Sequence, residues 1–444
     1  MIINFEFLPQ DYIAKKFRMS VPIDSGDTAW ILIAGSLVLL MIPALGLFEA
    51  GLLRRKNTVS IFMQIFFGLA LLSVMWFIFG FSLVFGPDTG GIAGNLDYVF
   101  LKNVPWNDSL PFAPTIPGVL FAKFQLMFAA ITPLLLTGVI AERMKFSAFI
   151  LFIAAWSVLI YYPLTHWIWG GGWLGHLGVF DFAGGIVIHT SVGMGALAAA
   201  LVLGKRRNYG PAIMVPHSIP IAVLGSSLLW LGWFGFNAGS ALSSGGVAGN
   251  TVIVTHMASS ISALIWVGLS WMRTGKPSVI AAINGAIAGL AGITPASGYV
   301  SVEHSFVIGI AIGLASYCGV LLIKDRLKID DALDVSSVHG IAGIIGSLAI
   351  GIFASAAINP HGPSGLLFGN PMQLLIQGIG VGVAGALGFG GTYAILKVLN
   401  FIVGIRVSKE VEDIGLDIGE HAEQAYADEE EFKLDEEEYH KTHK

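Results

Sequence analysis

The feature that most constrains this chain is its series of continuous apolar segments, because about 20 apolar residues are what a helix needs to cross a bilayer. We predict eleven such spans, at residues 29–53, 59–86, 117–140, 146–169, 182–204, 218–236, 250–272, 278–296, 304–323, 335–356 and 371–404. The runs are continuous rather than alternating, which favours helices over barrel strands. Hydrophobic residues make up 55% of the chain and charged residues 12%. Together these features predict an all-α polytopic membrane protein.

Basic residues are concentrated in the loops after the odd-numbered spans. These loops contain the basic segments 54–56, 143–145, 205–207, 273–276, 324–328 and 406–409. Lys102 is the only lysine or arginine in the loops after the even-numbered spans. Because loops rich in Lys and Arg stay in the cytoplasm, we expect the N-terminus outside the plasma membrane and the C-terminus inside.

An odd number of spans in each half inverts the second half relative to the first. Spans one to five (about 29–204) and six to ten (about 218–356) are therefore expected to form inverted repeats, followed by a long final helix (about 371–404). The expected parts are an extracellular segment (1–27), a membrane domain (28–404) and a cytoplasmic tail (405–444).

The tail has two regions of different composition. Asp428–Glu438 is an acidic run, typical of a solvated or disordered end. Gly415–Tyr426 has a more mixed composition, and we expect it to fold against the cytoplasmic face.

One histidine lies in the last span of each expected repeat. His189 lies in DFAGGIVIHTSVG (181–193) and His339 in DVSSVHGIAGIIG (334–346), each with glycine four positions later. On a helix this glycine shares the face of the histidine and allows another helix to approach. A single intramembrane histidine is as readily a hydrogen-bonded core residue as a functional group. Two at corresponding positions favour a shared role in a permeation path.

Aromatic and hydroxyl side chains gather at the expected outer ends of three spans. Phe124 and Phe128 lie four residues apart in the third span, and Trp169 ends the fourth. Phe236 and Ser240 end the sixth. The general interpretation is the aromatic belt of a membrane interface. The alternative is a cation vestibule, because aromatic faces attract cations and a hydroxyl accepts their hydrogen bonds.

Several ionisable residues lie in or beside the spans. Asp181 and Asp334 precede the fifth and tenth spans, where each is expected to cap a helix. Asp181 would also supply negative charge on the outer side. Glu49, Lys123 and Asp334 are candidate modulators, and Lys123 is expected to extend to the outer interface.

Motifs for soluble catalysis, nucleotide binding or metal ligation are missing from the sequence. We therefore expect no enzymatic activity, no cofactor, no metal and no nucleic-acid partner.

In order along the chain, these motifs resemble the Amt/Mep/Rh family of ammonium transporters over about residues 28–427. The matching stretches are RRKN (54–57), AER (141–143), WGGG (169–172), DFAGG…H (181–189), GWFGFNAGSA (232–241), GAIAGLAGITPASGY (285–299), DVSSVHG (334–340) and GLDIGEHAEQAY (415–426). Trp169 with Ser240 resembles the Amt/Mep branch rather than the Rh branch.

The resemblance implies roles for the candidate residues. His189 and His339 would be the twin pore histidines, and Asp181 a supporting acid. Phe128 and Phe236 would form a gate. The outer ammonium site would consist of Phe124, Phe128, Trp169 and Ser240. The resemblance also implies a homotrimer in the lipid bilayer and a PII-type regulatory protein at the cytoplasmic face.

Three positions depart from the family pattern. FEAG at 48–51 stands where many relatives have FYGG, so Glu49 replaces a tyrosine. Lys123 adds a positive charge beside the outer aromatic residues, and HAE at 421–423 replaces HGE.

The function that these observations favour is ammonium uptake through a narrow hydrophobic pore. Two alternatives stay open. The first is a non-conducting ammonium sensor of the same fold, against which the short tail without a recognisable kinase or cyclase domain argues. The second is an ion-coupled carrier for another small amine, against which the scarcity of acidic midplane residues argues.

Overall fold

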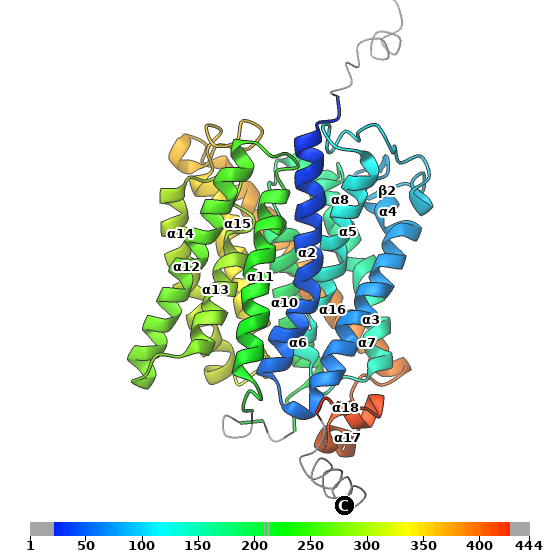
Figure 1. Cartoon of the computed structure of the whole chain (residues 1–444), viewed down its shortest axis with the longest axis vertical. Coiled ribbons are helices and arrows are strands. Elements are labelled where there is room, and N and C mark those ends of the chain that lie inside the picture. The colour runs from blue at the N-terminus through cyan, green and yellow to red at the C-terminus, as the bar shows by residue number, and fades with distance from the viewer. Residues whose placement is uncertain (1–21, 208, 211–213, 427–444) are drawn as a thin grey trace, which may run out of the picture.

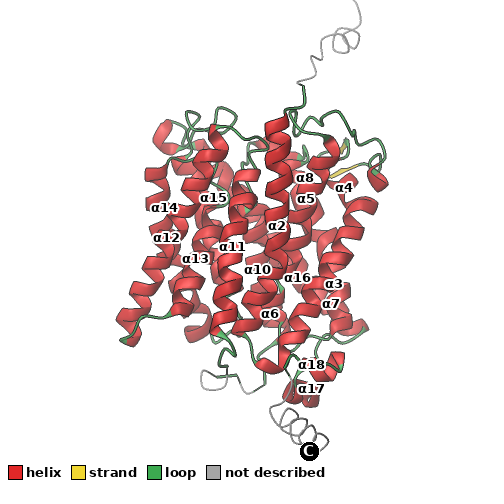
Figure 2. Cartoon of the chain, viewed as in Figure 1, coloured by secondary structure: helices red, strands yellow, loops and turns green. Residues whose placement is uncertain are grey.

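The computed structural model of the chain describes residues 22–207, 209–210 and 214–426. The acidic run Asp428–Glu438 and most of the expected segment 1–27 lie outside these ranges. Long helices stand side by side, and loops join them at the two ends of the bundle (Figure 1). Helix dominates the described chain (Figure 2), apart from a small antiparallel hairpin of β1 (Asp88–Thr89) and β2 (Ala93–Gly94).

The helices follow the apolar segments of the sequence. In the first half they are α2 (Ser25–Leu52), α3 (Thr58–Met75), α4 (Phe81–Phe85), α5 (Gly118–Leu134), α6 (Thr137–Ile140), α7 (Phe146–Trp156), α8 (Tyr162–Trp169), α9 (Trp173–Leu177) and α10 (Ser191–Leu203). In the second half they are α11 (Ile219–Gly239), α12 (Gly246–Thr274), α13 (Val279–Ile293), α14 (Val302–Val320), α15 (Ala342–Phe353), α16 (Met372–Ile402), α17 (Lys409–Ile414) and α18 (Leu416–His421).

Short helical turns extend or join these helices. The π-helical turns are η2 (Trp76–Gly80), η4 (Ser157–Tyr161), η5 (Gly185–Thr190), η6 (Leu321–Arg326) and η7 (Ser336–Ile341). The 3₁₀ turns are η1 (Arg55–Asn57), η3 (Val99–Leu101) and η8 (Leu366–Phe368). With these turns included, the helices coincide with the spans expected from the sequence.

Among the described residues, ten helices are long and apolar enough to cross a membrane. The remaining expected span coincides with α13, whose 15 residues fall short of the length that a perpendicular crossing needs. The described chain begins and ends at opposite ends of the bundle (Figure 1). An odd number of crossings gives this arrangement. The polytopic all-α fold is confirmed, while the count of eleven stays a prediction.

Glycines allow α2 and α11 to pack backbone against backbone. A Cβ atom at Gly225 would lie 2.3 Å from the backbone N of Phe48. A Cβ atom at Gly235 would lie 2.7 Å from the carbonyl O of Ala34. Small residues provide this close approach in membranes, where burial from water contributes little to helix association.

The two histidine-bearing helices cross at a second glycine contact. A Cβ atom at Gly193 in α10 would lie 2.0 Å from Cα of Gly340 in η7. Gly340 directly follows His339, and Gly193 lies one helical turn after His189. Gly343 packs against Cβ of His189. The small-residue contact expected beside each histidine is therefore present.

The variant Gly193→Ala is expected to destabilise the protein by about 1–3 kcal/mol or more, because the added methyl has no space and one helix backbone must move. The thermal unfolding midpoint of the purified protein in detergent measures this effect. Gly382→Ala in α16 is a matched control, because a Cβ atom there meets no atom within 4 Å. Equal midpoints for the two variants would contradict the proposed close approach.

The end of the bundle that carries α17 and α18, called the tail side here, contains a buried ion-pair network. Glu142 pairs with Arg54 at 2.9 Å and with Arg206 at 2.8 Å. Asp330 pairs with Arg206 and with Arg143, each at 2.9 Å. Burial raises the pKa of the Glu142 carboxyl. The positive charges of Arg206 and Arg54 lower it by more than burial raises it, so the pKa lies below its ordinary value. This network joins the ends of several helices.

The Gly415–Tyr426 segment folds against this face, as expected. The Asp417 carboxylate accepts a hydrogen bond from the Ser60 backbone N–H at 2.8 Å. The Glu420 carboxylate accepts one from the Phe146 N–H at 2.9 Å. Ala422 has a φ of 53°, a left-handed conformation that glycine adopts more easily. The HAE departure therefore places an alanine where the backbone favours glycine, yet the segment still docks.

Candidate functional site

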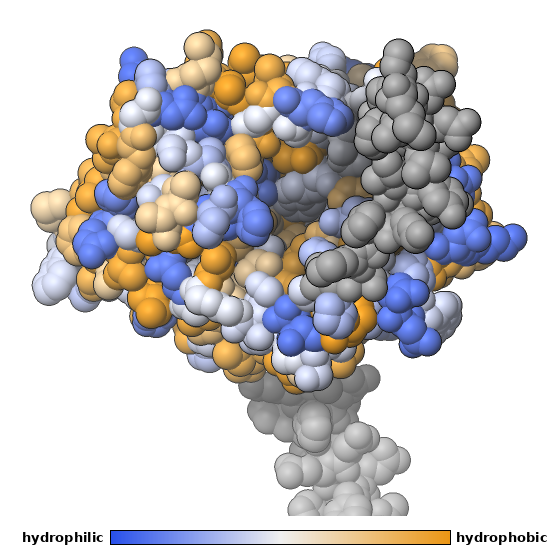
Figure 3. Space-filling model, turned by 90° about the horizontal axis from the view of Figure 1, so that it is seen from above, coloured by the Kyte–Doolittle hydropathy of each residue, from blue (hydrophilic) through white to orange (hydrophobic). Residues whose placement is uncertain are grey.

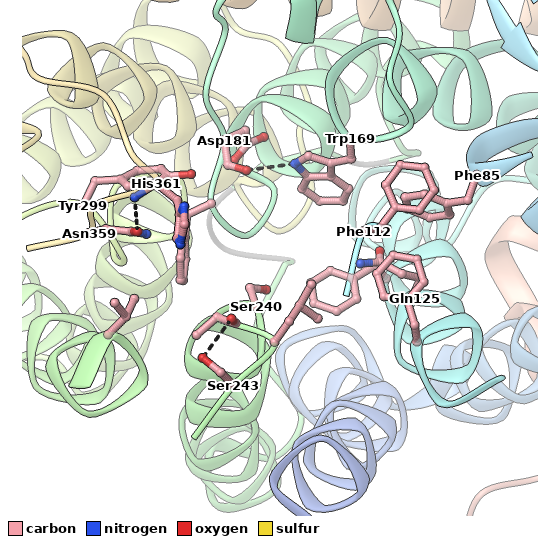
Figure 4. A pocket seen from close by; sticks show the side chains of 16 residues that line it. Phe85, Phe112, Gln125, Trp169, Asp181, Ser240, Ser243, Tyr299, Asn359 and His361 are labelled. Atoms are coloured by element: carbon pink, nitrogen blue, oxygen red, sulfur yellow. Dashed lines mark hydrogen bonds between the residues drawn. The ribbon is translucent and has the colours of Figure 1, made fainter. Parts of the chain in front are cut away.

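A cavity of about 400 Å³ opens on the end of the bundle opposite the tail side. It corresponds to the hollow on the face in Figure 3 and is shown from close by in Figure 4. Phe128, Trp169, Asp181 and Ser240 line this cavity, called the vestibule here. Phe128 lies in α5 and Trp169 ends α8, whereas Asp181 lies in the loop before η5 and Ser240 directly follows α11. The structure therefore brings together most of the residues expected at an outer site.

Aromatic rings form the floor of the vestibule. Phe128 and Phe236 have ring centroids 4.4 Å apart, and Phe128 meets Trp169 edge-on with centroids 6.2 Å apart. Both phenylalanines are at most 1% exposed. Phe124 lies behind Phe128, with ring centroids 5.0 Å apart, and packs against Gly239. Phe124 is not among the residues that line the vestibule, so its part in the outer ammonium site stays a prediction.

Asp181 organises this region through hydrogen bonds. Its carboxylate accepts four backbone N–H groups at 2.7–2.9 Å, from Gly184, Gly185, Ile186 and Val187. Its carbonyl oxygen accepts the Trp169 indole N–H at 2.8 Å. Asp181 thus caps η5 and fixes the Trp169 side chain. The expected capping role is therefore present.

The corresponding cap of η7 is Asp331 rather than Asp334. The Asp331 carboxylate accepts the backbone N–H groups of Val335 and Ser336 at 3.1 and 2.7 Å. Asp334 has a φ of 62° and pairs with Lys324 at 2.7 Å. The interval from Asp331 to His339 equals that from Asp181 to His189. This repeated spacing is the sequence signal that identifies the correct cap.

The two histidines meet inside the bundle. Their Nδ1 atoms are 3.2 Å apart, and the ring planes differ by 18°. His189 also stacks on Trp233, with centroids 5.7 Å apart. Both histidines lie in π-helical turns, η5 and η7, a distortion that is frequent at functional sites.

The contact between the Nδ1 atoms determines what the pair can offer to a solute. One Nδ1 must donate its hydrogen and the other must accept it. In a neutral pair, one Nε2 is then an N–H donor and the other an acceptor. Nε2 of His189 is buried without a hydrogen-bond partner among the described residues. The pair therefore has free hydrogen-bonding capacity of both kinds.

A small cavity of about 20 Å³ adjoins the histidines. This space accommodates about one water-sized molecule. Its wall is apolar apart from the two imidazoles and one indole, and consists of Met41, Leu45, Phe48, Ile131, Leu135, Ile188, His189, Leu229, Trp233, Phe236, Ile287 and His339. Phe236 is close to Phe128 of the vestibule floor and to His189. A passage between the two cavities would therefore run past the phenylalanine pair.

Two charged candidates lie outside both cavities. Lys123 lies over Gly35 of α2, where a Cβ atom would be 2.6 Å from its Nζ. It does not line the vestibule. Glu49 is buried near the tail-side end of α2 and contacts Thr137.

Sequence reasoning missed several residues around the two cavities. Trp233 is three residues before Phe236 in α11, so helical periodicity identifies it as a residue of the same face. Gln125, Tyr299 and His361 line the vestibule. His361 lies in a loop where no periodic pattern indicates its position.

The fold and the two cavities define a multi-pass helical membrane protein of the transporter and channel class. The profile of the Ammonium Transporter Family matches residues 29–426. Ammonium transporter 1 of Dictyostelium discoideum is 53% identical over 407 residues, covering 91% of this chain and 88% of that protein. The chain belongs to the Ammonium Transporter Family, and its relatives are transport proteins rather than enzymes.

Solved structures agree with this assignment. Mep2 of Candida albicans is similar with a TM-score of 0.84 and 35% identity, covering 94% of each chain. A structure described as "Sensor Amt Protein" is similar with a TM-score of 0.82 and 31% identity, covering 89% of this chain and 98% of that one.

Proposed function

We propose that the protein recruits ammonium in the vestibule and passes ammonia through the histidine-bearing cavity, with or without a separately relayed proton. The observation that carries this proposal is the narrow apolar cavity whose free polar groups belong mainly to His189 and His339. Such a cavity excludes hydrated ions by size. It also provides hydrogen bonds to a small molecule that both donates and accepts them.

Recruitment would use the aromatic faces of Phe128 and Trp169 together with the Ser240 hydroxyl. A desolvated cation gains about 2 kcal/mol or more from an aromatic face. The Ser240 hydroxyl donates to the Phe236 carbonyl at 2.9 Å, so its oxygen remains able to accept a hydrogen bond from ammonium. The Asp181 carboxylate adds negative charge nearby. Phe128 and Phe236 act as the gate.

Selectivity would follow from desolvation. Moving a bare cation into the apolar cavity costs much free energy of desolvation. Neutral ammonia avoids this cost and can hydrogen-bond both imidazoles. Ammonium becomes ammonia by losing a proton, which potassium cannot do. The same two histidines would thus favour ammonium over potassium.

We also propose the organisation that the sequence indicates. The vestibule faces outward and the tail side faces the cytoplasm, in accordance with the basic residues of the tail-side loops. The extracellular segment, the two repeats with the final helix, and the cytoplasmic tail are the functional parts. A homotrimer is the expected assembly and a PII-type regulatory protein the expected tail-side partner. Both rest on the family resemblance.

The second candidate function is a non-conducting ammonium sensor. The observation that supports this candidate is the similarity of the chain to a structure described as "Sensor Amt Protein". A sensor would bind ammonium in the vestibule without passing it.

The deciding experiment is current measurement on a solid-supported membrane with the purified full-length protein in liposomes. An ammonium pulse is expected to give a current that a potassium pulse does not give. An internal pH dye detects electroneutral ammonia passage in the same liposomes. Ammonium binding with neither signal would overturn the transport proposal and support the sensor.

A further inference from the structure

Glu49 has a buried carboxyl group that has no role in the ammonia passage proposed above. It is 2% exposed and lies near the tail-side end of α2. Burying an unpaired carboxylate is costly, so such a group generally takes a proton or a cationic partner. An intramembrane ionisable residue is in addition a candidate functional group.

Glu49 continues the wall of the histidine-bearing cavity. Met41, Leu45 and Phe48 of α2 line that cavity. Glu49 follows Leu45 by four residues, so it lies on the same face of α2, one turn closer to the tail side. Figure 1 shows α6 beside this part of α2.

Two other walls of the cavity also lead to Glu49. Leu135 lines the cavity, and Thr137, two residues later, hydrogen-bonds the Glu49 carboxyl. His339 lines the cavity too, and Val335, one turn before it, packs with Glu49 around Gly138. Three elements that surround the cavity therefore converge on this carboxyl at its tail-side end.

Glu49 has no cationic partner among the described residues. None of the ion pairs in the described ranges involves Glu49. The next basic residue along the chain, Arg54, pairs with Glu142 at 2.9 Å. The neighbours of Glu49 from α6 and from the residue that precedes η7 are Thr137, Gly138 and Val335, none of which ionises. A bound proton is therefore the remaining way to neutralise the carboxyl.

The hydrogen bonds around Glu49 have a place for that proton. The Thr137 hydroxyl lies within hydrogen-bond distance of the Leu134 carbonyl oxygen and, at 2.7 Å, of Glu49 Oε2. A threonine hydroxyl has one hydrogen, so it cannot donate to both oxygens. If Glu49 is protonated, its O–H donates to Thr137, and Thr137 donates to Leu134. Both contacts are then satisfied.

We propose that Glu49 is a proton-exchanging group at the cytoplasmic exit of the passage. Ammonia that leaves the histidine-bearing cavity takes the Glu49 proton, which gives an ammonium ion and a Glu49 carboxylate. The carboxylate then regains a proton from cytoplasmic water or buffer. The inference rests on the proposed function, and it adds a binding and proton-transfer site that the family resemblance does not supply.

The test combines infrared spectroscopy with current measurement on the full-length protein in liposomes. Wild-type protein at neutral pH is expected to show the C=O band of a protonated carboxyl, which is missing in Glu49→Gln and decreases after an ammonium pulse. The Glu49→Gln variant is expected to lose about tenfold or more of the ammonium flux, because general acid–base groups contribute at least that much. Its half-saturating external ammonium concentration should stay near the wild-type value.

Two variants separate proton exchange from a structural role. Glu49→Asp retains a carboxyl and is expected to restore part of the flux and the band. Glu303→Gln is a matched control, because Glu303 is an exposed glutamate in the first turn of α14, at the end of that helix remote from the tail side. It should leave flux and band unchanged.

The outcomes also distinguish this inference from the proposed function. If wild-type protein passes no ammonium, the proposed function fails. If wild-type protein transports and Glu49→Gln matches it, the proton-exchange role fails and transport stands. If Glu49→Gln does not fold, the wild-type spectrum decides, because a protonated-carboxyl band that ammonium leaves unchanged overturns the inference.

Discussion

Replacing His189 and His339 together with alanine is expected to lower selective ammonium flux about a hundredfold. Each imidazole offers one hydrogen bond to a solute in an otherwise apolar cavity. Losing two hydrogen bonds worth about 1–1.5 kcal/mol each removes about 2–3 kcal/mol, and each 1.4 kcal/mol corresponds to about tenfold in rate. The enlarged cavity is also expected to admit water and reduce discrimination against potassium.

This prediction is tested by ammonium and potassium currents, together with internal pH, in liposomes that contain equal amounts of each variant. His256→Ala is the matched control, because His256 is an exposed histidine of α12 that packs against Trp230. Single alanine variants reveal whether the two histidines act as a unit. Unchanged rate and selectivity in the double variant would exclude the proposed role of the pair.

The second large effect is expected on stability, from Glu142→Gln. The Glu142 carboxylate is buried and accepts hydrogen bonds from Arg54, Asn57 and Arg206. Removing its charge leaves buried guanidinium groups with less compensation, which costs about 3–5 kcal/mol in comparable buried pairs. The thermal unfolding midpoint in detergent should fall clearly. Asp325→Asn is the control, because its pair with Arg273 is about half exposed and exposed pairs contribute little.

The pH dependence of this effect follows from the direction of the pKa shift. The pKa of Glu142 lies below its ordinary value of 4.5 in the folded protein. The ion pair therefore stabilises the folded state fully above that value, and this contribution is lost as pH falls through the lower folded pKa. The difference in unfolding midpoint between wild type and Glu142→Gln should shrink in this acidic range. A difference that grows on acidification would contradict the assigned shift.

Much of the fold follows from the sequence, because a bilayer imposes strong constraints. A span must be apolar, sufficiently long and helical, so continuous apolar runs predict the helices directly. The exception is informative: α13 is a shorter apolar helix, and its length alone does not decide whether it crosses. The end of a span is harder to predict where a π-helical turn continues the helix, since η6 extends α14 to Arg326, beyond the expected end at residue 323.

The candidate site was predictable where residues repeat at fixed intervals. His189 and His339 are conspicuous because polar groups are scarce within apolar spans. The contact between the two histidines cannot be read from the sequence, because it depends on how closely η5, η7 and α10 approach at Gly193 and Gly340. Asp334 is the carboxylate nearer the tenth span, but the backbone N–H groups of Val335 and Ser336 donate to Asp331. The equal Asp-to-His intervals in the two halves are the sequence signal for this cap.

The sequence by itself determined the class of protein, the approximate spans, the family and the chemistry of the central residues. The class and the spans depend on composition and periodicity, whereas the family depends on the motifs that carry the resemblance. All of these are local features of the sequence. Only the tertiary structure decided that Phe124 lies behind Phe128, that Trp233 stacks on His189, and that Glu49 lies within hydrogen-bond distance of Thr137. Such arrangements depend on distances between segments far apart in the chain, and side-chain packing alone sets those distances.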